Sequence, residues 1–473
     1  MSQPGRSKKM SLFSRSGRSA ATGHITAKMV RINLMAKRNF GPNRRELMAG
    51  LGAAVFAPAV HGIAAQPPQP LMLRAAASNL ALRAGQVETP IWALEGPTPE
   101  AGLRIGRGEQ LEVSFANGLP VPAVLDWRGL EGLATAEPLT ARTPLAGGAK
   151  ETLQVQFRHA GTFLCDPRLL GDAQARPVRP LALVVGEREP IAVDSDEVLL
   201  IEDWRLRPDG SAIAAGTDPK DTTAFYTVNG QTSRDIPLRF NQRCRFRFIN
   251  GFQRNVVAVK IEGHEVWVMA LDGQPAEPFP ARNGTLVLAP GGRIDVFIDA
   301  TAPPGSTSAI LLHDGKEARP IARLVTSKEP ALRAAPLQQP APLPSNGLPA
   351  QLDLKNAVRA DLTLGGSPSD WVTPAHFAIT SASAFRARSG RAVVLALTSR
   401  AERANVFHLH GHHFRLLDRL DDGWKPFWLD TLAVEPGQTQ RIAFLAEHAG
   451  RWLIEAAATD WAAPRLVRWY SVE

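Results

Sequence analysis

Residues 405–414 read Asn405-Val406-Phe407-His408-Leu409-His410-Gly411-His412-His413-Phe414, and they hold four of the chain's 11 histidines. On an extended strand, side chains two residues apart point to the same face, so His408 and His410 would lie side by side. Two adjacent imidazoles can bind one metal ion or two neighbouring ions. Taken alone, the stretch is as compatible with packed or solvated histidines as with a metal site.

Short runs of alternating apolar and polar residues surround this stretch along the chain. Examples are residues 111–115, 245–249 and 441–445. Turn signals separate such runs at Asn117-Gly118, Asn229-Gly230, Asp272-Gly273 and Pro436-Gly437. Regular short strands with turns of this kind predict β-sandwiches. No long amphipathic helix is indicated, so we expect an all-β fold.

The length of 473 residues predicts two to four domains. One boundary is expected at residues 186–190, after an apolar strand, and another at the proline-rich residues 327–351, which should form a semi-extended connector. The expected segments are a leader at 1–65, β-domains at 70–187, 192–327 and 352–473, and a linker at 328–351.

The order of the motifs in residues 75–473 resembles that of the multicopper oxidases. The histidine stretch is similar to that family's third copper motif, His-Pro-x-His-x-His-Gly. Other segments resemble the family in the same order: residues 94–97, 108–109 and 117–120 in the first domain, 226–230, 245–250, 271–273 and 289–295 in the second, and 430–431 and 450–452 in the third. The resemblance implies three consecutive cupredoxin-like Greek-key β-sandwich domains after an export signal.

Copper chemistry in that family uses ten histidines and one cysteine, which hold a type 1 copper and a three-copper cluster that reduces dioxygen to water. Most of the matching positions carry other residues here: Asp126, Arg128, Asp166, Arg168, Asn405, Glu455, Ala456, Ala457, Trp461 and, near the axial position, Leu466. Only His408 and His410 match. A blue-copper site requires a thiolate, which Ala456 cannot supply. The family's route for electron entry is therefore absent.

The charged replacements predict what fills the former copper cavity. Arginine is permanently cationic, so Arg128 and Arg168 would repel copper. We expect them to pair with Asp126 and Asp166 in a buried ion-pair network. An alternative is that the aspartates bind a hard metal ion.

Two roles remain open for His408 and His410. As structural remnants they would hydrogen-bond to Asp126, Asp166 or Glu455. They could instead retain one copper or zinc ion, together with His412, His413 or an acid. Only Met72 and Met269 follow the leader, so the chain has no methionine-rich segment of the kind that gathers copper in cuprous oxidases of this family. The expectation is no cofactor, with copper as the alternative.

The leader carries the chain's basic excess. Residues 1–65 hold 11 of the 54 Lys and Arg residues and one of the 45 acids, so the remainder has 43 basic and 44 acidic residues. This balance argues against nucleic-acid binding. Arg44-Arg45 precede an uncharged stretch, residues 47–65, which ends in small residues and resembles a twin-arginine export signal. An ordinary secretory signal or an uncleaved anchor is the alternative. The stretch is too short and weakly apolar for a permanent membrane span.

We expect a few further residues to have mainly structural roles. Cys165 and Cys244 are the only cysteines, and the periplasm would permit a disulfide between them without requiring one. Trp127 and Trp452 are expected in the core, and His264 is expected to be structural.

These features leave three alternative functions open. The first is a non-catalytic periplasmic scaffold or interaction protein with an unidentified protein partner. It would be similar to the copper-free members of the family, of which a bacterial cell-division accessory protein is the known example. The second is a copper-binding oxidoreductase with a single-metal site at His408 and His410. The third is a hydrolase or binding protein that holds an anion or sugar in the former copper cavity.

Overall fold

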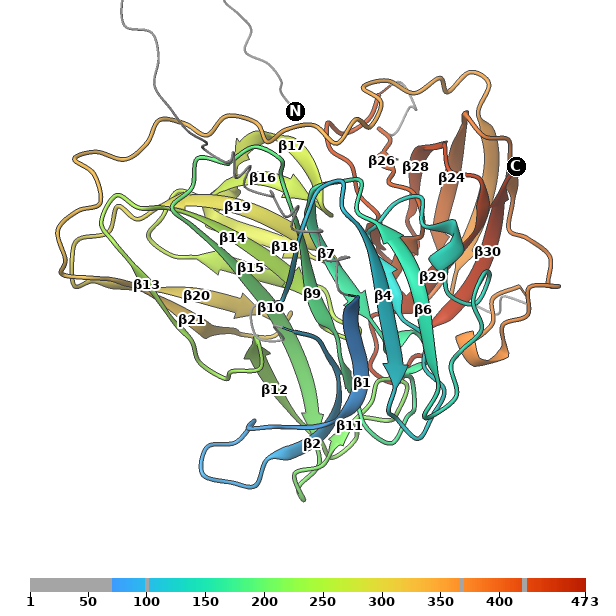
Figure 1. The fold of residues 1–473 in the computed structure, drawn as a ribbon, viewed down its shortest axis with the longest axis horizontal. Coiled ribbons are helices and arrows are strands. Elements are labelled where there is room, and N and C mark those ends of the chain that lie inside the picture. Colours follow the sequence, from blue (N-terminus) through green and yellow to red (C-terminus); the bar gives the residue numbers. More distant parts are fainter. Residues whose placement is uncertain (1–69, 98–101, 366–369, 419–422) are drawn as a thin grey trace, which may run out of the picture. The chain divides into compact units, whose positions relative to one another are not determined.

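The computed structural model describes residues 70–97, 102–365, 370–418 and 423–473 (Figure 1). All the described residues belong to one compact unit, Gln66–Glu473. The predicted export signal lies outside the described residues. Within the described part, no helix has the length and apolar character needed to cross a membrane.

The first sandwich pairs a five-stranded sheet with a four-stranded sheet. In spatial order the larger sheet contains β6 (Lys150–Gln156), β4 (Gln110–Asn117), β1 (Leu71–Leu80), β2 (Thr89–Glu95) and β8 (Val178–Arg179). The smaller sheet contains β3 (Leu103–Gly106), β9 (Leu181–Gly186), β7 (Gly161–Asp166) and β5 (Asp126–Arg128). Both sheets contribute to one core, in which Phe115, Trp127 and Phe163 are buried.

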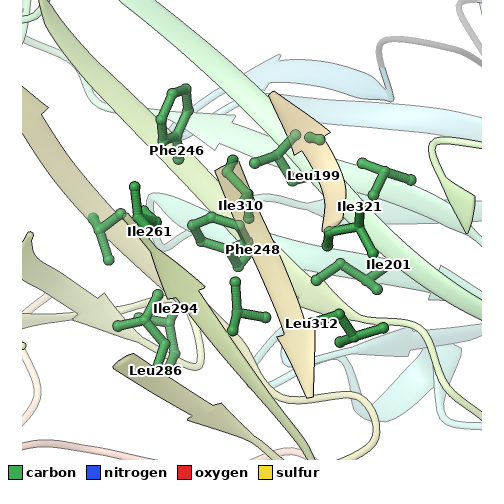
Figure 2. Close-up of a cluster of buried hydrophobic side chains, with 14 of the residues drawn as sticks. Leu199, Ile201, Phe246, Phe248, Ile261, Leu286, Ile294, Ile310, Leu312 and Ile321 are labelled. Carbon is green, nitrogen blue, oxygen red and sulfur yellow. The ribbon is translucent and has the colours of Figure 1, made fainter. Parts of the chain in front are cut away.

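The second sandwich has the largest core. One sheet contains β11 (Ala212–Ile213), β10 (Ser195–Leu206), β14 (Arg243–Asn250), β19 (Arg293–Asp299), β16 (Trp267–Leu271) and β17 (Gln274–Pro280), with β12 (Thr223–Val228) also paired to β10. The other contains β13 (Asp235–Leu238), β21 (Ala318–Thr326), β20 (Thr307–His313), β15 (Val257–Ile261) and β18 (Thr285–Leu288). Figure 2 shows Phe246 and Phe248 of β14 among aliphatic side chains from both sheets, including Ile310 and Leu312 of β20.

The third sandwich contains the histidine stretch. One sheet has β22 (Val358–Leu364), β24 (Arg391–Ser399), β28 (Thr439–Ala446) and β26 (Arg415–Leu416). The other has β23 (Arg386–Ala387), β30 (Leu466–Val472), β29 (Gly450–Ala458), β25 (Asn405–Leu409) and β27 (Thr431–Val434). Their shared core buries Phe407, Phe444, Trp452 and Tyr470.

The all-β prediction is confirmed. The helices among the described residues are four single 3₁₀ turns: η1 (Ala134–Ala136), η2 (Arg168–Leu170), η3 (Arg282–Gly284) and η4 (Pro374–His376). Each of the six sheets takes its strands from one of the three segments expected from the sequence. The domain boundaries themselves stay predictions.

The Asp272-Gly273 turn behaves as its sequence indicates. It joins β16 to β17 in a two-residue hairpin loop, with Leu271 paired to Gln274. Asp272 has φ 46° and Gly273 has φ 80°. Positive φ at both central positions is the type I′ requirement, which glycine meets without strain from a Cβ.

The polar face of β14 is buried, although its alternating pattern is ordinary for a half-exposed strand. Arg245 and Arg247 are each 1% exposed, because this face lies against other chain segments rather than water. Their guanidinium groups donate to Asp295 at 2.6 and 3.0 Å. Asp295 also accepts from Thr162 of the first sandwich at 2.6 Å. The arginines therefore help to join two sandwiches.

The two cysteines are both buried free thiols, so no disulfide joins Cys165 to Cys244. Burial raises the pKa of the Cys165 thiol, and it raises the pKa of Cys244 to about 11. Both thiols behave as small core side chains, Cys165 on β7 and Cys244 on β14.

Candidate functional site

The candidate site lies where β5 of the first sandwich meets β25 and β29 of the third. Arg128 of β5 donates from Nη1 to Glu455 Oε1 of β29 at 3.1 Å, across 327 residues of sequence. His408 of β25 is directly opposite Glu455 in the antiparallel ladder. Strand pairing in one sandwich and contact between sandwiches thus bring together charged groups that are distant in sequence.

Strand alternation explains why these side chains face one another. On β5, Trp127 points into the core of the first sandwich, so Asp126 and Arg128 point to the opposite face. On β25 and β29, Phe407 and Ala456 are paired and belong to the core of the third sandwich. The predictions that Trp127 and Trp452 are core aromatics are confirmed.

Arg168 and Asp166 form the pair expected from the sequence. Arg168 donates from Nε to Asp166 Oδ1 and from Nη2 to Oδ2, both at 2.7 Å. Two parallel charge-assisted bonds of this kind are strong and directional. Burial alone would raise the pKa of Asp166, but Arg168 outweighs it and lowers the pKa to about 2.

Arg128 has a different main partner from the one predicted. Its Nη1 is 3.9 Å from Asp126 Oδ2 but 3.1 Å from Glu455 Oε1. Arg465 donates to the other oxygen of Glu455 at 2.7 Å. Although burial opposes ionisation of Glu455, Arg465 and Arg128 hold its pKa well below the ordinary value. The sequence-based pairing of Arg128 with Asp126 is therefore secondary.

His410 is enclosed by carboxylates. Its Nε2 is 2.8 Å from Glu455 Oε1, which confirms one of the predicted partners. Its Nδ1 is 3.0 Å from Glu137 Oε1 and 3.7 Å from Asp126 Oδ1. Burial disfavours a charge on His410, but Glu137 and Asp126 outweigh it and raise the pKa well above the ordinary value. His410 is therefore held as an imidazolium.

His408 has partners that the sequence interpretation missed. Its Nδ1 donates to the Asp430 carbonyl oxygen at 3.0 Å and lies 3.1 Å from Thr431 Oγ1. No hydrogen bond joins His408 to Asp126, Asp166 or Glu455 in the part of the chain that the structure describes, because its Nδ1 is directed to the residues at the start of β27. Burial, reinforced by the Arg128 charge, lowers the pKa of His408 to about 3. The ring is neutral.

One group of described side chains places four possible metal-ligand atoms near one another. A ligand atom from each of Asp126, His408, His410 and Glu455 can be chosen so that all four lie within 4.8 Å of one another. Burial, aided by Glu455, raises the pKa of Asp126 to about 7, although His410 and Arg128 oppose the rise. The carboxyl group of Asp126 is thus poised between its acid and its carboxylate near neutral pH.

The remaining matched positions offer little to a metal. Asn405 donates from Nδ2 to Ser399 Oγ at 3.3 Å. Ala456 is in the core, and Leu466 packs against it. Ala457 faces a cavity. Trp461 packs with residues of the second sandwich and donates from Nε1 to the Ala214 carbonyl oxygen at 3.1 Å.

His412 and His413 belong to separate hydrogen-bond groups. His413 Nδ1 lies 2.6 Å from Glu131 Oε1, and its Nε2 lies 2.8 Å from the Asp272 carbonyl oxygen. His412 Nδ1 lies 2.7 Å from the Tyr470 hydroxyl. Neither joins the four-residue ligand group, in which the structure brings Asp126 and Glu455 to the histidine pair. Of the alternatives left open by the sequence, acids rather than His412 or His413 therefore lie beside the histidine pair.

A small cavity adjoins the cluster. It leaves about 30 Å³ for the centre of a water molecule to occupy, and its lining includes Arg128, Arg168, Arg254, Glu455 and Arg465. Sequence reasoning missed Arg254, Arg465 and Glu137. These residues lie outside the recognised motifs, and no spacing pattern marks them as neighbours of the site.

Comparisons with known proteins agree with this architecture. Two sequence profiles, both described as multicopper oxidase, match residues 195–318 and 351–473. The multicopper oxidase MmcO of Mycobacterium tuberculosis (strain ATCC 25618 / H37Rv) is 24% identical over 411 residues, which cover 74% of this chain and 77% of that protein. Laccase-8 of Oryza sativa subsp. japonica is 25% identical over 310 residues, which cover 59% of this chain and 53% of the laccase.

Solved structures give the same picture. The crystal structure of a multi-copper oxidase from Pseudomonas thermotolerans aligns with a TM-score of 0.73 and 26% identity, over 86% of this chain and 99% of that one. Lac15 from a marine microbial metagenome aligns with a TM-score of 0.71 and 24% identity, over 85% of this chain and all of that one.

Proposed function

This chain belongs to the multicopper oxidase family, and we propose that it is a periplasmic, non-catalytic member that acts as a scaffold or interaction protein. In this proposal the sandwiches are kept as a rigid framework, and the metal positions are filled by protein charges. A protein partner in the periplasm is part of the proposal, which leaves that partner unidentified.

One observation carries the proposal: buried guanidinium groups occupy the region where copper ligands would be needed. Arg128 Nη1 lies 3.1 Å from Glu455 Oε1, and Arg168 is paired to both oxygens of Asp166. A copper ion placed here would face these fixed cations in a low-dielectric setting, where like-charge repulsion is strong. The residues present therefore do not fit a three-copper cluster.

The type 1 position gives independent support. Ala456 has no donor atom and is buried in an apolar core together with Phe407 and Trp452. The described thiols, Cys165 and Cys244, belong to the cores of the other two sandwiches. No thiolate is thus available where the family route of electron entry would need one.

Export by a twin-arginine-type signal at residues 1–65 is the other part of the proposal. It rests on Arg44-Arg45 and the uncharged stretch that follows. Shared fold and shared ligand loss support a scaffold role only by analogy, because a fold does not determine a function.

Metal analysis of the full chain, purified from a copper-supplemented export host, tests the proposal. We expect much less than one equivalent of copper and no oxidation of a phenol or of cuprous ion. A laccase prepared in the same way serves as the positive control. A blue protein that consumes dioxygen with a phenolic donor would overturn the proposal.

A second candidate is a reduced site for one copper or zinc ion. The four ligand atoms from Asp126, His408, His410 and Glu455 within 4.8 Å favour it. It requires the His410 imidazolium to lose its proton and Arg128 to release Glu455. One equivalent of metal that is lost in His408→Ala would support this candidate over the first.

A further inference from the structure

Four arginines with buried side chains line the cavity beside Glu455. Arg128, Arg168, Arg254 and Arg465 are each at most 8% exposed. The acids in the same lining are Asp166 and Glu455. The wall of the cavity therefore carries more positive than negative charge. Such an excess is costly where water is largely excluded.

Arg168 is mostly occupied by protein partners, whereas Arg128 is not. Arg168 donates to both oxygens of Asp166 and, through Nη1, to the Gly251 carbonyl oxygen at 2.6 Å. Arg128 donates from Nη1 to Glu455 at 3.1 Å, and its buried Nε has no hydrogen-bond partner among the described residues. These two groups fix the shape of the wall.

Arg254 donates from Nε and Nη1 to the carbonyl oxygens of Ala463 and Gln253 and pairs with Asp172, whereas Arg465 pairs through Nη1 with Glu455. Asp172 serves both residues: its Oδ2 is 2.6 Å from Arg254 Nη2 and accepts from the Arg465 backbone N–H at 2.6 Å. Arg465 Nε is buried and has no hydrogen-bond partner in the described part of the chain. Burial lowers the pKa of Arg254, and the Arg465 charge adds to this effect although Asp172 opposes it. Three carboxylates, Asp166, Glu455 and Asp172, are thus paired with four guanidinium groups, because Arg128 and Arg465 share Glu455.

The remaining residues that line the cavity explain why it is not filled by side chains. Val406 and Ala457 are neighbours in the β25–β29 ladder and both line the cavity. The short side chain of Ala457 leaves space that a larger residue would fill. About 30 Å³ is open to a water centre, roughly twice the minimum for one ordered water. This is far too small for a drug-sized ligand.

We propose that this cavity is a binding site for a small oxyanion, such as phosphate, sulfate or a short carboxylate. Guanidinium groups offer paired N–H donors that match the oxygens of such anions. Arg128 and Arg465 line the cavity and each have a buried Nε–H without a partner among the described residues, so they can donate to an anion, and the excess of arginines supplies the charge. The site needs no metal, so the inference stands independently of the proposed scaffold function.

Anion-dependent stability of the full chain tests this inference. At constant ionic strength and pH 7, sodium phosphate replaces sodium chloride, and the Tm is measured alongside phosphate binding by equilibrium dialysis. A ligand that binds only the folded state raises the Tm, here by an expected ~3 °C at saturation. Sulfate and acetate arms distinguish the inorganic from the carboxylate source. No anion-specific shift and no bound phosphate would overturn the inference, because water would then fill the cavity.

Two variants locate the binding. Arg465→Lys keeps the charge but removes Nε, and it should weaken phosphate binding by about tenfold or more. Arg323→Lys, at an exposed arginine paired with Asp235, is the matched control and should bind as the wild type does. If Arg465→Lys does not fold, Ala457→Leu fills the cavity without changing any arginine and should abolish binding. Unchanged binding in both variants would overturn the inference.

Discussion

His410 Nε2 lies 2.8 Å from Glu455 Oε1, with both side chains buried between the first and third sandwiches. Together with Glu137, this contact holds His410 as an imidazolium by raising its pKa. A protonated histidine thus provides positive charge in the region that we propose corresponds to the family's copper site. The charge balance of the interior depends on it.

Removal of this imidazolium should be strongly destabilising. His410→Ala leaves Glu137 and Asp126 without their cationic partner, and breaking a buried charge group costs about 3–5 kcal/mol. Urea unfolding followed by tryptophan fluorescence measures the loss. His313→Ala, at an exposed histidine of β20, should change the unfolding free energy by less than about 0.5 kcal/mol. Equal effects of the two substitutions would contradict the charged role of His410.

Asp126 should give the stability a distinctive pH dependence. Its folded pKa is about 7 and its ordinary value is 3.8, so between these values the folded state holds a proton that the unfolded state has lost. This contribution is fully present below pH 3.8 and is lost as the pH rises through 7. Asp126→Asn removes the proton exchange. The wild type should therefore lose stability relative to this variant between pH 4.5 and 8.

Urea midpoints of the two proteins across that range give the measurement. Asp361→Asn, at an exposed aspartate of β22, is the control and should track the wild type. A constant difference between the wild type and Asp126→Asn would mean that Asp126 stays ionised throughout.

We expect the positive charge of Arg128 to prevent metal binding at the group of four possible ligands formed by Asp126, His408, His410 and Glu455. Arg128→Gln removes the cation beside Asp126 and Glu455, which frees carboxylate oxygens for a metal ion. We expect zinc binding in equilibrium dialysis to tighten at least about tenfold relative to the wild type. Arg323→Gln removes an exposed arginine and should have no effect. Equal zinc binding in Arg128→Gln and wild type would show that the guanidinium is not the obstacle.

Gly411 is required for packing as well as for its backbone conformation. Its φ is +74°, and a Cβ there would collide with the ring of Trp452. Gly437 has φ +71° but open space around the same position. Gly437→Ala should therefore cost only the backbone strain of about 1–2 kcal/mol. Gly411→Ala should cost a further ~1–3 kcal/mol from overpacking. Chemical denaturation compares them, and similar losses would remove packing against Trp452 as the reason for this glycine.

Much of the fold followed from local sequence signals, because strands and tight turns are specified by neighbouring residues. Residues 441–445 alternate and lie within β28. Asp272-Gly273 forms the hairpin that its composition indicates. The order of the short motifs then identified the family.

The site was only partly predictable, because its contacts join distant segments. The pairing of Arg168 with Asp166 was found, since both residues lie on one short stretch. The role of Arg465 was missed, because the loop that carries it has no recognisable motif. Glu137 was missed for the same reason, although it reaches His410 from the segment after η1. Contacts of this kind depend on how whole sandwiches meet, which strand periodicity does not encode.

Trp461 joins two sandwiches at a position that the resemblance to multicopper oxidases matches to a copper ligand. Its indole now anchors the third sandwich to the second through the Ala214 carbonyl oxygen, and Arg205 stacks over its ring at 5.5 Å. A metal ligand could therefore replace Trp461 only at the expense of this contact. Such a substitution would weaken the joint between the two sandwiches before it could contribute to binding a metal ion.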